Sequence, residues 1–429
     1  MEGKKKVLFY GAGVYAAVIY RHARQKSELY GEPVAFIDRD PYKRGHDLFG
    51  LPIFSWEDAR ERYGDSFYVY VTAEPRVAPD IISFLLEQSF SAKQIINYEP
   101  VEKRLGCRNA DHSLVALLDG SYVYYRGCNA IGDNLSYKDI TLACRVELGR
   151  ASHPDELKKS VNTIRDMNNM ISGGACEGIY ENCRDCIDRK MKYYFSKQKL
   201  RRFNICGTVP CNYKCCYCCQ DHEVYEKFRG EAYPLSRKIL HALEQEGLID
   251  GDTCISIGAG EFTANVGGNE LVAEMAGKYP LLLLTNGYLF SLEAAGAIKQ
   301  SGAILCDLDA GTPESYRKIK GVDGFKQVSE HIREYAKYGP IILKYILLEG
   351  MNDSPEDLEG FFKLADEIAT RVDLTRDFLN ISGRFSDNTL RFAAKFIKHF
   401  RDKGKLNMSM AAFVRSGEGE RLNRILEEL

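Results

Sequence analysis

Three cysteines in one short stretch constrain this chain more strongly than any other feature of its sequence. Cys211, Cys215 and Cys218 have the spacing C-x3-C-x2-C, and the aromatic Tyr217 stands directly before the last of them. The apolar segment 203–206 precedes this stretch and is expected to form a strand. Three thiolates on one loop can hold an iron–sulfur cube and leave one of its irons without a protein ligand. Such an iron can bind a small molecule, so the spacing favours a catalytic cluster.

Zinc is the alternative metal for the same loop. Structural zinc sites usually take four ligands in paired C-x2-C units. Cys216, inside the triplet, or Cys219, directly after it, could add a fourth thiolate. In that case the chain would be a non-catalytic metal-binding protein.

The cysteine content points to metal or redox chemistry rather than to disulfides. The chain has 429 residues, enough for two to three domains, and its 14 cysteines all lie between Cys107 and Cys306. The formal net charge of −2 gives no reason to expect nucleic-acid or membrane-surface binding. No segment approaches the roughly eighteen apolar residues of a membrane span, and the lysines at 4–6 precede too short an apolar run for a secretion signal. We therefore expect a cytoplasmic protein.

Residues 1–104 contain no cysteine and are expected to form a separate unit. A strand at 7–10 leads into the glycine motif at 11–13 and then a helix, which gives the pattern G-x-G-x-x-A. Glycines at Gly11 and Gly13 would let a phosphate approach the helix N-terminus closely. A second strand ends at Asp38, whose carboxylate could bond a ribose hydroxyl. We expect these three residues to bind a nucleotide, with an empty scaffold domain as the alternative; later strands are expected at 67–71 and 94–98, and a helix at 79–88.

Residues 105–200 are predicted to be a connector that carries a second metal site. Cys176, Cys183 and Cys186 have the spacing C-x6-C-x2-C, and glycines precede the first of them. Cys206 is the candidate for a fourth ligand, with Cys216 or Cys219 as alternatives. We expect a second [4Fe-4S] cluster here, with zinc or no metal as the alternatives. Cys107, Cys128 and Cys144 are most simply small buried hydrophobes, and a helix is expected at 154–169.

Residues 201–429 alternate strand-like and helical segments, which predicts an α/β fold with a parallel sheet. In such sheets the functional groups collect at the carboxyl ends of the strands. The cysteine loop follows the first strand, Gly258-Ala259-Gly260-Glu261 the second, Thr285-Asn286-Gly287 the third, and Asp307–Gly311 the fourth. The predicted strands are 203–205, 254–257, 281–284, 304–308, 341–347 and 378–381, with a further strand-like piece at 406–413.

The cysteine triplet with its aromatic residue resembles the cluster loop of the radical S-adenosylmethionine (SAM) superfamily. This resemblance implies that the open iron of a [4Fe-4S] cluster binds the amino and carboxylate groups of SAM. An electron from the cluster would cleave SAM to methionine and a 5′-deoxyadenosyl radical, which takes a hydrogen atom from the substrate. The resemblance also implies a partial (β/α)6 TIM-like barrel, and an electron donor such as a flavodoxin or ferredoxin.

Strand-end motifs extend this resemblance. The segment Gly258-Ala259-Gly260-Glu261 is similar to the family's Gly-Gly-Glu motif, in which backbone and carboxylate bind the SAM amino group. Ala259 replaces a glycine of that motif, and Phe262 stands where proline is common. Asn286 and Asp309 correspond to strand ends near the ribose and the substrate, and Tyr217 belongs to the same cofactor site. Cys306 is a candidate second hydrogen donor, with a buried structural thiol as the alternative.

Residues 1–104 resemble the Rossmann-like, nucleotide-sugar-binding domains that precede sugar acyltransferases and some glycan-modifying enzymes. The resemblance is carried by the glycine motif at 11–13, by 35–40 and by 50–53. It implies a nucleotide or nucleotide sugar in this domain. It favours a sugar, nucleotide sugar or glycan precursor as the substrate of an epimerisation, dehydration or oxidation. A peptide or protein maturase is the rival enzyme, which an auxiliary cluster would favour.

Overall fold

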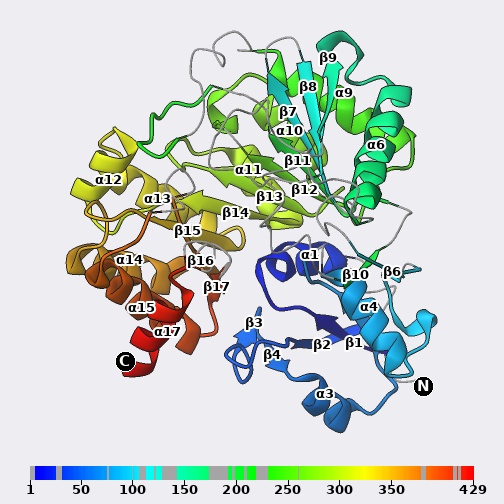
Figure 1. Cartoon of the computed structure of the whole chain (residues 1–429), viewed down its shortest axis with the longest axis horizontal. Coiled ribbons are helices and arrows are strands. Elements are labelled where there is room, and N and C mark those ends of the chain that lie inside the picture. Colours follow the sequence, from blue (N-terminus) through cyan, green and yellow to red (C-terminus); the bar gives the residue numbers. More distant parts are fainter. Residues whose placement is uncertain are drawn as a thin grey trace.

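Two α/β units make up the chain, one around a small sheet and one around a large sheet (Figure 1). The predicted α/β class is confirmed, because both sheets are largely parallel. None of the described helices is both long and apolar enough to cross a bilayer. The computed structural model describes residues 5–25, 31–74, 77–98, 100–105, 113–119, 122–127, 143–172, 192–195, 199–206, 210–218, 230–258, 260–377, 383–408, 413 and 417–429.

The small sheet lies in the N-terminal unit and has the strand order β3-β4-β2-β1-β5. Its four parallel strands therefore stand in the order third, second, first and fourth along the chain. Strand β5 lies on the side of β1 opposite to β2, so the order of the strands reverses at β1. The loops that follow β1 and β5 therefore lead to opposite sides, and a crevice is expected between them. The elements are β1 (Lys6–Tyr10), α1 (Val14–Gln25), β2 (Glu32–Ile37), β3 (Asp47–Leu48), β4 (Leu51–Phe54), α3 (Trp56–Tyr63), β5 (Tyr68–Val71) and α4 (Ala78–Glu87).

The strand predicted at 94–98 is wrong. The segment begins as the 3-10 helix η1 (Ala92–Gln94), and only Ile95 makes a single bridge, to Val69. The side chain of Gln94 accepts a hydrogen bond from the N–H of Ser91 at 3.1 Å, which caps this turn. This local hydrogen bonding outweighs the apolar character of Ile95 and Ile96.

The large sheet has ten strands in the order β17-β16-β15-β14-β13-β12-β11-β7-β8-β9. Neighbours from β17 to β7 are parallel, and β8 and β9 join as antiparallel strands. Three strands from the predicted connector therefore extend the same sheet, so this sheet does not begin at residue 201. The strands are β7 (Ser113–Asp119), β8 (Tyr122–Arg126), β9 (Ala143–Glu147), β11 (Arg202–Cys206), β12 (Cys254–Gly258), β13 (Leu281–Thr285), β14 (Gly302–Asp307), β15 (Ile341–Leu347), β16 (Arg371–Arg376) and β17 (Leu406–Met408), with β6 (Glu102–Leu105) and β10 (Lys192–Phe195) as a separate pair.

The sixth strand lies earlier than its predicted position at 378–381. The structure has β16 at Arg371–Arg376, and residues 378–382 fall outside the described part of the chain. Val372 and Leu374 are buried on one side of β16, whereas Asp373 lies between them on the other. Charged residues interrupt this strand, so its apolar residues do not form a continuous run that would identify it from the sequence.

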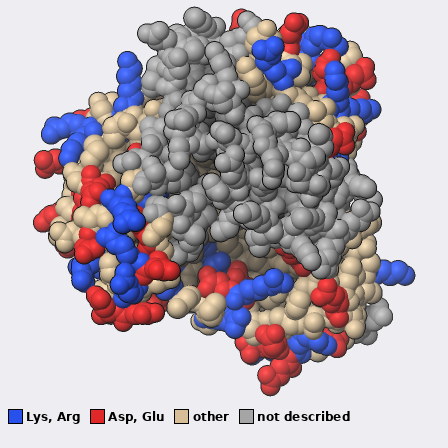
Figure 2. All heavy atoms as spheres, viewed as in Figure 1, with Lys and Arg blue, Asp and Glu red and all other residues tan. Residues whose placement is uncertain are grey.

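Helices cover one face of the large sheet. Leu281, Leu283, Ile304 and Ile341 point to this face and belong to one core with the helices. On the outer surface, in the part that Figure 2 describes, Lys and Arg are interspersed with Asp and Glu.

The helices are α6 (Pro154–Ser172), α9 (Ala232–Gln245), α10 (Gly268–Met275), α11 (Leu292–Gln300), α12 (Pro313–Lys320), α13 (Phe325–Ala336), α14 (Pro355–Ile368), α15 (Asp387–Asp402) and α17 (Gly419–Glu428).

Helix α1 packs between the two sheets. Its Val18 is fully buried against Leu282, Leu305 and Ile342, which point to the face of the large sheet opposite the helices. We call this the α1 face. The other side of α1 packs on the small sheet through residues such as Tyr20. A helix that is apolar on both sides is expected where protein covers both of them.

Hydrogen bonds also join the two units at α1. Arg371 of β16 is buried and donates from Nη2 and Nε to the carbonyl oxygen of Ala12, at 2.6 and 3.1 Å. Burial lowers the pKa of Arg371 to about 10. Arg21 donates to the carbonyl oxygens of Lys299, at 2.6 Å, and Tyr338, at 3.3 Å. The position of the glycine motif is therefore fixed relative to the large sheet.

Candidate functional site

The cysteine loop, residues 210–218, follows β11 at the carboxyl edge of the large sheet. The N–H of Cys218 donates to the carbonyl of Cys215 at 2.9 Å, which closes a turn. The N–H of Cys216 donates to the carbonyl of Ile319 at 2.9 Å, which fixes the loop to the end of α12. Cys211, Cys215 and Cys218 are partly buried, whereas Cys216 is exposed. The three predicted ligands thus differ from Cys216 in their surroundings.

The three thiols lie close enough to influence one another's ionisation. Burial raises the pKa of Cys211 to about 12, and the charges of Glu261, Cys215 and Cys218 also raise it. Burial likewise raises the pKa of Cys215 to about 11. Thiolates in such surroundings need a cationic partner, which a metal cluster supplies.

The three thiols match the number of protein ligands that a [4Fe-4S] cluster with one open iron takes. Among the described residues, no three Cys, His, Asp or Glu side chains are placed as the ligands of one metal ion.

Glu261 joins the ends of β12 and β13. It is fully buried, and its Oε1 accepts hydrogen bonds from the hydroxyls of Thr263, at 2.7 Å, and Thr285, at 2.9 Å. Its Oε2 accepts one from the N–H of Asn286 at 2.7 Å. Burial raises the pKa of Glu261, and the hydrogen bond from Asn286 opposes this shift. The carboxylate is therefore already anchored by protein donors, chiefly through Oε1.

Asn286 connects these strand ends to the cysteine loop. Its Nδ2 donates to Oδ1 of Asn212 at 2.7 Å and lies 3.8 Å from Sγ of Cys211.

Gly260, on the β12 loop, has a φ of 67°, a conformation that favours glycine. A Cβ on Gly258 would come within 3.0 Å of the Leu284 side chain. The structure thus brings together Gly258, Gly260, Glu261 and Asn286, while Ala259 lies outside the described residues.

The fourth strand end holds a buried ion pair below the cysteine loop. Oδ2 of Asp309 lies 2.6 Å from Nζ of Lys320 and accepts a hydrogen bond from the hydroxyl of Tyr217 at 2.5 Å. Its Oδ1 accepts one from the N–H of Ile346 at 2.7 Å. The side chains of Lys320 and Asp309 are 1% and 0% exposed. Asp309 has a φ of 57°, so the chain holds this carboxylate in an uncommon backbone conformation.

Lys320 is the functional-site residue that the sequence analysis missed. Burial lowers its pKa, but the charges of Asp309, Cys215 and Asp307 outweigh burial and raise the pKa above its ordinary value. The sequence offered little signal, because a lysine in the last turn of a helix is the common partner of the helix dipole. Its partner could be found only once α12 was known to lie beside β14.

Cys306 lies apart from this site. Its side chain is fully buried in the core on the helix-covered face, beneath Gly287. Burial raises its pKa well above the usual range. This placement favours a structural thiol and gives no support to a role as hydrogen donor.

The second predicted metal site cannot be placed. Cys176, Cys183 and Cys186 lie outside the described residues. The backbone of Cys206 ends β11, but its side chain is not among those described. The auxiliary cluster stays a prediction.

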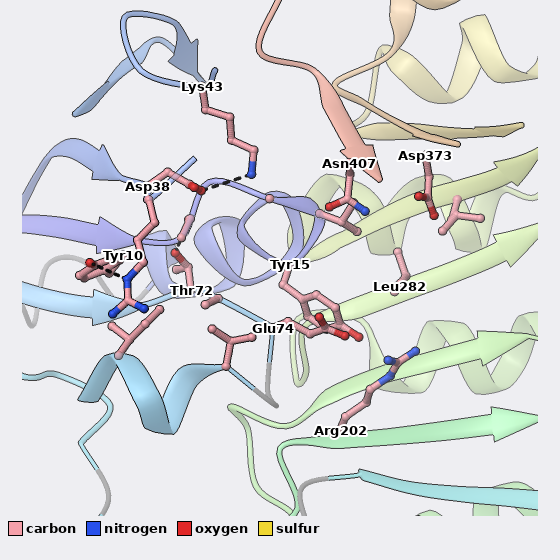
Figure 3. A pocket seen from close by; sticks show the side chains of 18 residues that line it. Tyr10, Tyr15, Asp38, Lys43, Thr72, Glu74, Arg202, Leu282, Asp373 and Asn407 are labelled. Carbon is pink, nitrogen blue, oxygen red and sulfur yellow. Dashed lines mark hydrogen bonds and ion pairs between the residues drawn. The ribbon is translucent and has the colours of Figure 1, made fainter. Parts of the chain in front are cut away.

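The glycine motif lies in a cavity of about 430 Å³ between the two units (Figure 3). Gly11 has a φ of 115°, and a Cβ there would lie 2.7 Å from the backbone nitrogen of Ala73. Oδ2 of Asp38 accepts a hydrogen bond from the N–H of Ala12 at 2.7 Å and lies 3.3 Å from Nζ of Lys43. The structure thus brings Gly11, Gly13 and Asp38 together. Arg202, Leu282, Leu305, Asp373 and Asn407 of the large sheet complete the lining.

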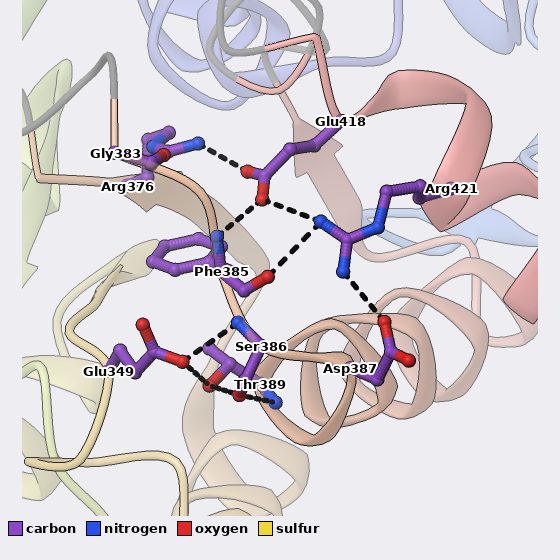
Figure 4. Close-up of polar contacts among 9 residues, drawn as sticks. All are labelled: Glu349, Arg376, Gly383, Phe385, Ser386, Asp387, Thr389, Glu418 and Arg421. Carbon is purple, nitrogen blue, oxygen red and sulfur yellow. Dashed lines mark hydrogen bonds and ion pairs between the residues drawn. The ribbon is translucent and has the colours of Figure 1, made fainter.

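A third polar group fixes the chain after β16 (Figure 4). Arg376 and Glu418 form an ion pair in which both side chains are 1% exposed. Glu418 also accepts a hydrogen bond from the N–H of Phe385, and Arg421 donates to the carbonyl of Phe385 at 3.1 Å. Oε1 of Glu349, after β15, accepts a hydrogen bond from the N–H of Ser386 at 2.8 Å. Helix α17 therefore anchors the segment that leaves the carboxyl edge of β16.

Known proteins resemble the part of the chain that carries the cysteine loop. Residues 205–365 match the profile of the Radical SAM superfamily. A probable GTP 3′,8-cyclase of Metallosphaera sedula is 28% identical over 38% of this chain and 50% of that protein. A GTP 3′,8-cyclase of Alkaliphilus metalliredigens is 26% identical over 39% of this chain and 53% of that protein. The chain spans about half the length of the curated relatives it matches.

Among solved structures, SuiB of Streptococcus suis bound to S-adenosylmethionine has a TM-score of 0.40 with this chain. The identity is 12%, and the superposition covers 74% of each chain.

Proposed function

We propose that the chain is a radical SAM enzyme in which Cys211, Cys215 and Cys218 hold a [4Fe-4S] cluster whose fourth iron binds SAM. The observation that carries this proposal is the meeting of the cysteine loop with the ends of three neighbouring strands. Asn286 and Glu261 join the loop to β12 and β13, and Asp309 and Lys320 join it to β14. Cluster and SAM together would supply a 5′-deoxyadenosyl radical that removes a hydrogen atom from the substrate.

The chain's own residues would bind and orient SAM beside the loop. Within the described residues, Oε2 of Glu261 accepts one hydrogen bond and keeps acceptor capacity for the SAM amino group. The backbone at Gly258 and Gly260 would lie along the methionine part, and Asn286 near the ribose. Oδ2 of Asp309 accepts hydrogen bonds from the hydroxyl of Tyr217 and from Nζ of Lys320. Asp309 would therefore hold Tyr217 in place beside the loop.

We also infer the finer fold of each unit. The six strands β11 to β16 are parallel neighbours in chain order with helices between them, which supports a partial (β/α)6 barrel. The α1 face would then be its interior. The order third, second, first and fourth in the small sheet is the order with which a Rossmann sheet begins. The cavity lies at the carboxyl ends of β1, β2 and β5, where such sheets bind ligands.

The proposed substrate is a sugar, nucleotide sugar or glycan precursor. The support is the glycine-lined cavity, which opens on the α1 face of the sheet that carries the cysteine loop. The relatives are described as GTP 3′,8-cyclases, so GTP is a further candidate. Nucleotide sugars and GTP carry phosphate, which the glycine motif would bind.

The test is 5′-deoxyadenosine formation by the full chain, reconstituted with iron and sulfide under anaerobic conditions and supplied with SAM and dithionite. UDP-glucose, GDP-mannose and GTP are added one at a time. We expect 5′-deoxyadenosine in every case and a higher rate with the compound class that the enzyme uses. A reconstituted protein that forms no 5′-deoxyadenosine under any of these conditions would refute the proposed function.

A further inference from the structure

A row of polar side chains crosses the α1 face of the large sheet. Asp307 of β14 pairs in register with Lys344 of β15, Lys344 with Asp373 of β16, and Asp373 with Asn407 of β17. Nζ of Lys344 lies 3.3 Å from Oδ1 of Asp307. These two side chains are 21% and 31% exposed, so they face accessible space rather than packed core. We call these four residues the polar row.

The polar row links the interface cavity to the cysteine loop. Asp373 and Asn407, at one end, line the cavity. Asp307, at the other end, stands two residues before Asp309, whose carboxylate holds Tyr217. Two residues of an extended chain span about 7 Å. A molecule lying along the row would therefore reach from the cavity to the neighbourhood of the cysteine loop.

The opposite end of the cavity has an apolar wall. Tyr10, Val77 and Ile81 line it, and the guanidinium of Arg39 lies 5.1 Å from the ring centre of Phe84 and 6.0 Å from that of Tyr10. In Figure 3, Tyr10 and Asp38 lie at one side of the cavity, and Asp373, Asn407 and Arg202 lie at the other. The cavity thus has apolar side chains beside the small sheet, from Tyr10, Val77 and Ile81, and polar side chains at the large sheet, from Asp373, Asn407 and Arg202.

The glycine motif stands between these two ends. A Cβ on Gly13 would lie 3.8 Å from Nζ of Lys43 and 3.8 Å from Oδ1 of Asn407. The missing side chain therefore keeps open the space between a lysine of one unit and an amide of the other. Backbone N–H groups in the first turn of α1 have no carbonyl partners within the helix. Together with Lys43, they suit phosphate oxygens.

The charges of the lining are mixed, which restricts the ligand further. Arg39, Lys43 and Arg202 are basic, and Asp38, Glu74 and Asp373 are acidic. A ligand that is only anionic would be repelled by the acidic side chains. A ligand that carries both phosphate and hydroxyl groups can satisfy both kinds of partner.

We propose that the interface cavity and the polar row form one elongated site for a nucleoside diphosphate that carries a hydroxyl-rich group. The nucleoside lies against Tyr10 and Ile81, and the diphosphate lies at Gly13 and Lys43. The hydroxyl-rich group lies along Asp373, Lys344 and Asp307, beneath the cysteine loop. The N-terminal unit is then one half of the substrate site rather than a separate binding module. This inference rests on the proposed function only for the reaction at the far end of the ligand, and not for binding.

The test measures binding in the full chain with Cys211, Cys215 and Cys218 all changed to alanine, so that no cluster chemistry intervenes. Isothermal titration calorimetry compares UDP with UDP-glucose, GDP with GDP-mannose, and ADP with ADP-glucose. We expect at least one pair to bind, and its sugar-bearing member to bind roughly tenfold more tightly because of added hydrogen bonds to the polar row. Binding of none of the six compounds would overturn the proposal.

Two variants in this background assign the two halves of the ligand. Lys43→Met should weaken both members of the pair by roughly tenfold or more, because it removes a phosphate contact. Lys344→Met should remove the advantage of the sugar-bearing member and leave binding of the nucleoside diphosphate unchanged, because Lys344 belongs to the polar row and does not line the cavity. Asp307→Asn is the substitute if that variant does not fold. Lys93→Met, at an exposed position of the N-terminal unit, is the control and should change neither affinity.

The outcomes separate this inference from the proposed function. If the polar-row variants weaken both members of the pair equally, the hydroxyl-rich group does not lie on the row and the inference is wrong. If Lys43→Met changes neither affinity, the diphosphate does not lie at the glycine motif and the inference is equally wrong. Intact binding in a protein whose reconstituted parent forms no 5′-deoxyadenosine would refute the proposed function alone.

Discussion

The cysteine loop and the interface cavity both gather polar side chains on the large sheet, but the surroundings of those side chains differ. At the strand ends, Glu261 accepts four hydrogen bonds from protein donors and Asp309 accepts three. In the cavity, Asp373 borders an open volume of about 430 Å³. The strand-end carboxylates are fully buried, whereas Asp373 is only partly so.

This difference indicates that the polar side chains of the two regions have different roles. The hydrogen bonds of Glu261 and Asp309 to protein donors fix the strand ends and the loop that carries the three cysteines. Charged groups that border an open volume are available to a ligand. The following predictions test whether the two regions differ in this way, beginning with the largest expected effect.

Cys215→Ala should abolish SAM cleavage, whereas Cys216→Ala should not. The two residues are neighbours, but only Cys215 belongs to the triplet that we assign to the cluster. We expect the rate of 5′-deoxyadenosine formation to fall at least about a thousandfold in Cys215→Ala, because the cofactor supplies the chemistry. Equal losses in both variants would mean that the loop tolerates no substitution, and that the triplet has no special role.

Lys320→Met should destabilise the fold strongly, because it leaves the charge of Asp309 buried without its partner. We expect the free energy of unfolding to fall by about 3–5 kcal/mol, measured by denaturant titration. Lys318→Met, two residues earlier and exposed, should change it by no more than about 0.5 kcal/mol.

The double variant Lys320→Met with Asp309→Asn should recover part of the lost stability, since it no longer buries an unpaired charge. If Lys320→Met costs no more than Lys318→Met, the strand-end region is not built on a buried ion pair.

Asp373→Asn should stabilise the fold at high pH. Burial raises the pKa of Asp373 to about 7, opposed by Lys344 and reinforced by Asp307 and Glu74. The folded chain therefore keeps a proton that the unfolded chain loses near pH 4, and stability falls as pH rises from about 4 to 7. We expect a gain in unfolding free energy of up to about 4 kcal/mol at pH 8, shrinking towards zero near pH 4.

The measurement is denaturant unfolding of both proteins at several pH values. The exposed Asp402, changed to asparagine, is the control and should show no such trend. A pH-independent effect of Asp373→Asn would show that its carboxylate is as well solvated as one on the surface.

Val18→Ala should loosen the contact between α1 and the large sheet. Val18 is fully buried against Leu282 and Leu305, so removing two methyl groups should cost about 2 kcal/mol. Val266→Ala, at a side chain that is 70% exposed, should cost almost nothing. The Tm values of the two variants are measured by thermal unfolding. Equal Tm values would contradict the packing of α1 on the large sheet.

The local patterns of the sequence were sufficient to predict the strand ends. The runs at 254–257 and 281–284 became β12 and β13 with little change. The run at 281–284 is continuously apolar, as expected of a strand that is covered on both faces. The polar motifs after them meet at one edge, since parallel strands place their carboxyl ends together. The glycine motif likewise lies between β1 and α1, as its pattern indicated.

Features that depend on distant parts of the chain could not be predicted. The strand β16 was missed because Asp373 faces the cavity and breaks the apolar run. Lys320 looks like an exposed residue until α12 places it beside Asp309. The strands β7 to β9 join the large sheet through β11, a pairing between segments about ninety residues apart that no local pattern encodes.

The most direct test of the central claim is a count of iron and sulfide per chain after anaerobic reconstitution. The unaltered protein is compared with the variant in which Cys211, Cys215 and Cys218 are all alanine. We expect the variant to lose about four irons and four sulfides, from eight to four if the auxiliary cluster exists and from four to none if it does not. An unchanged iron count, or zinc in place of iron, would contradict the assignment of these three cysteines to a catalytic cluster.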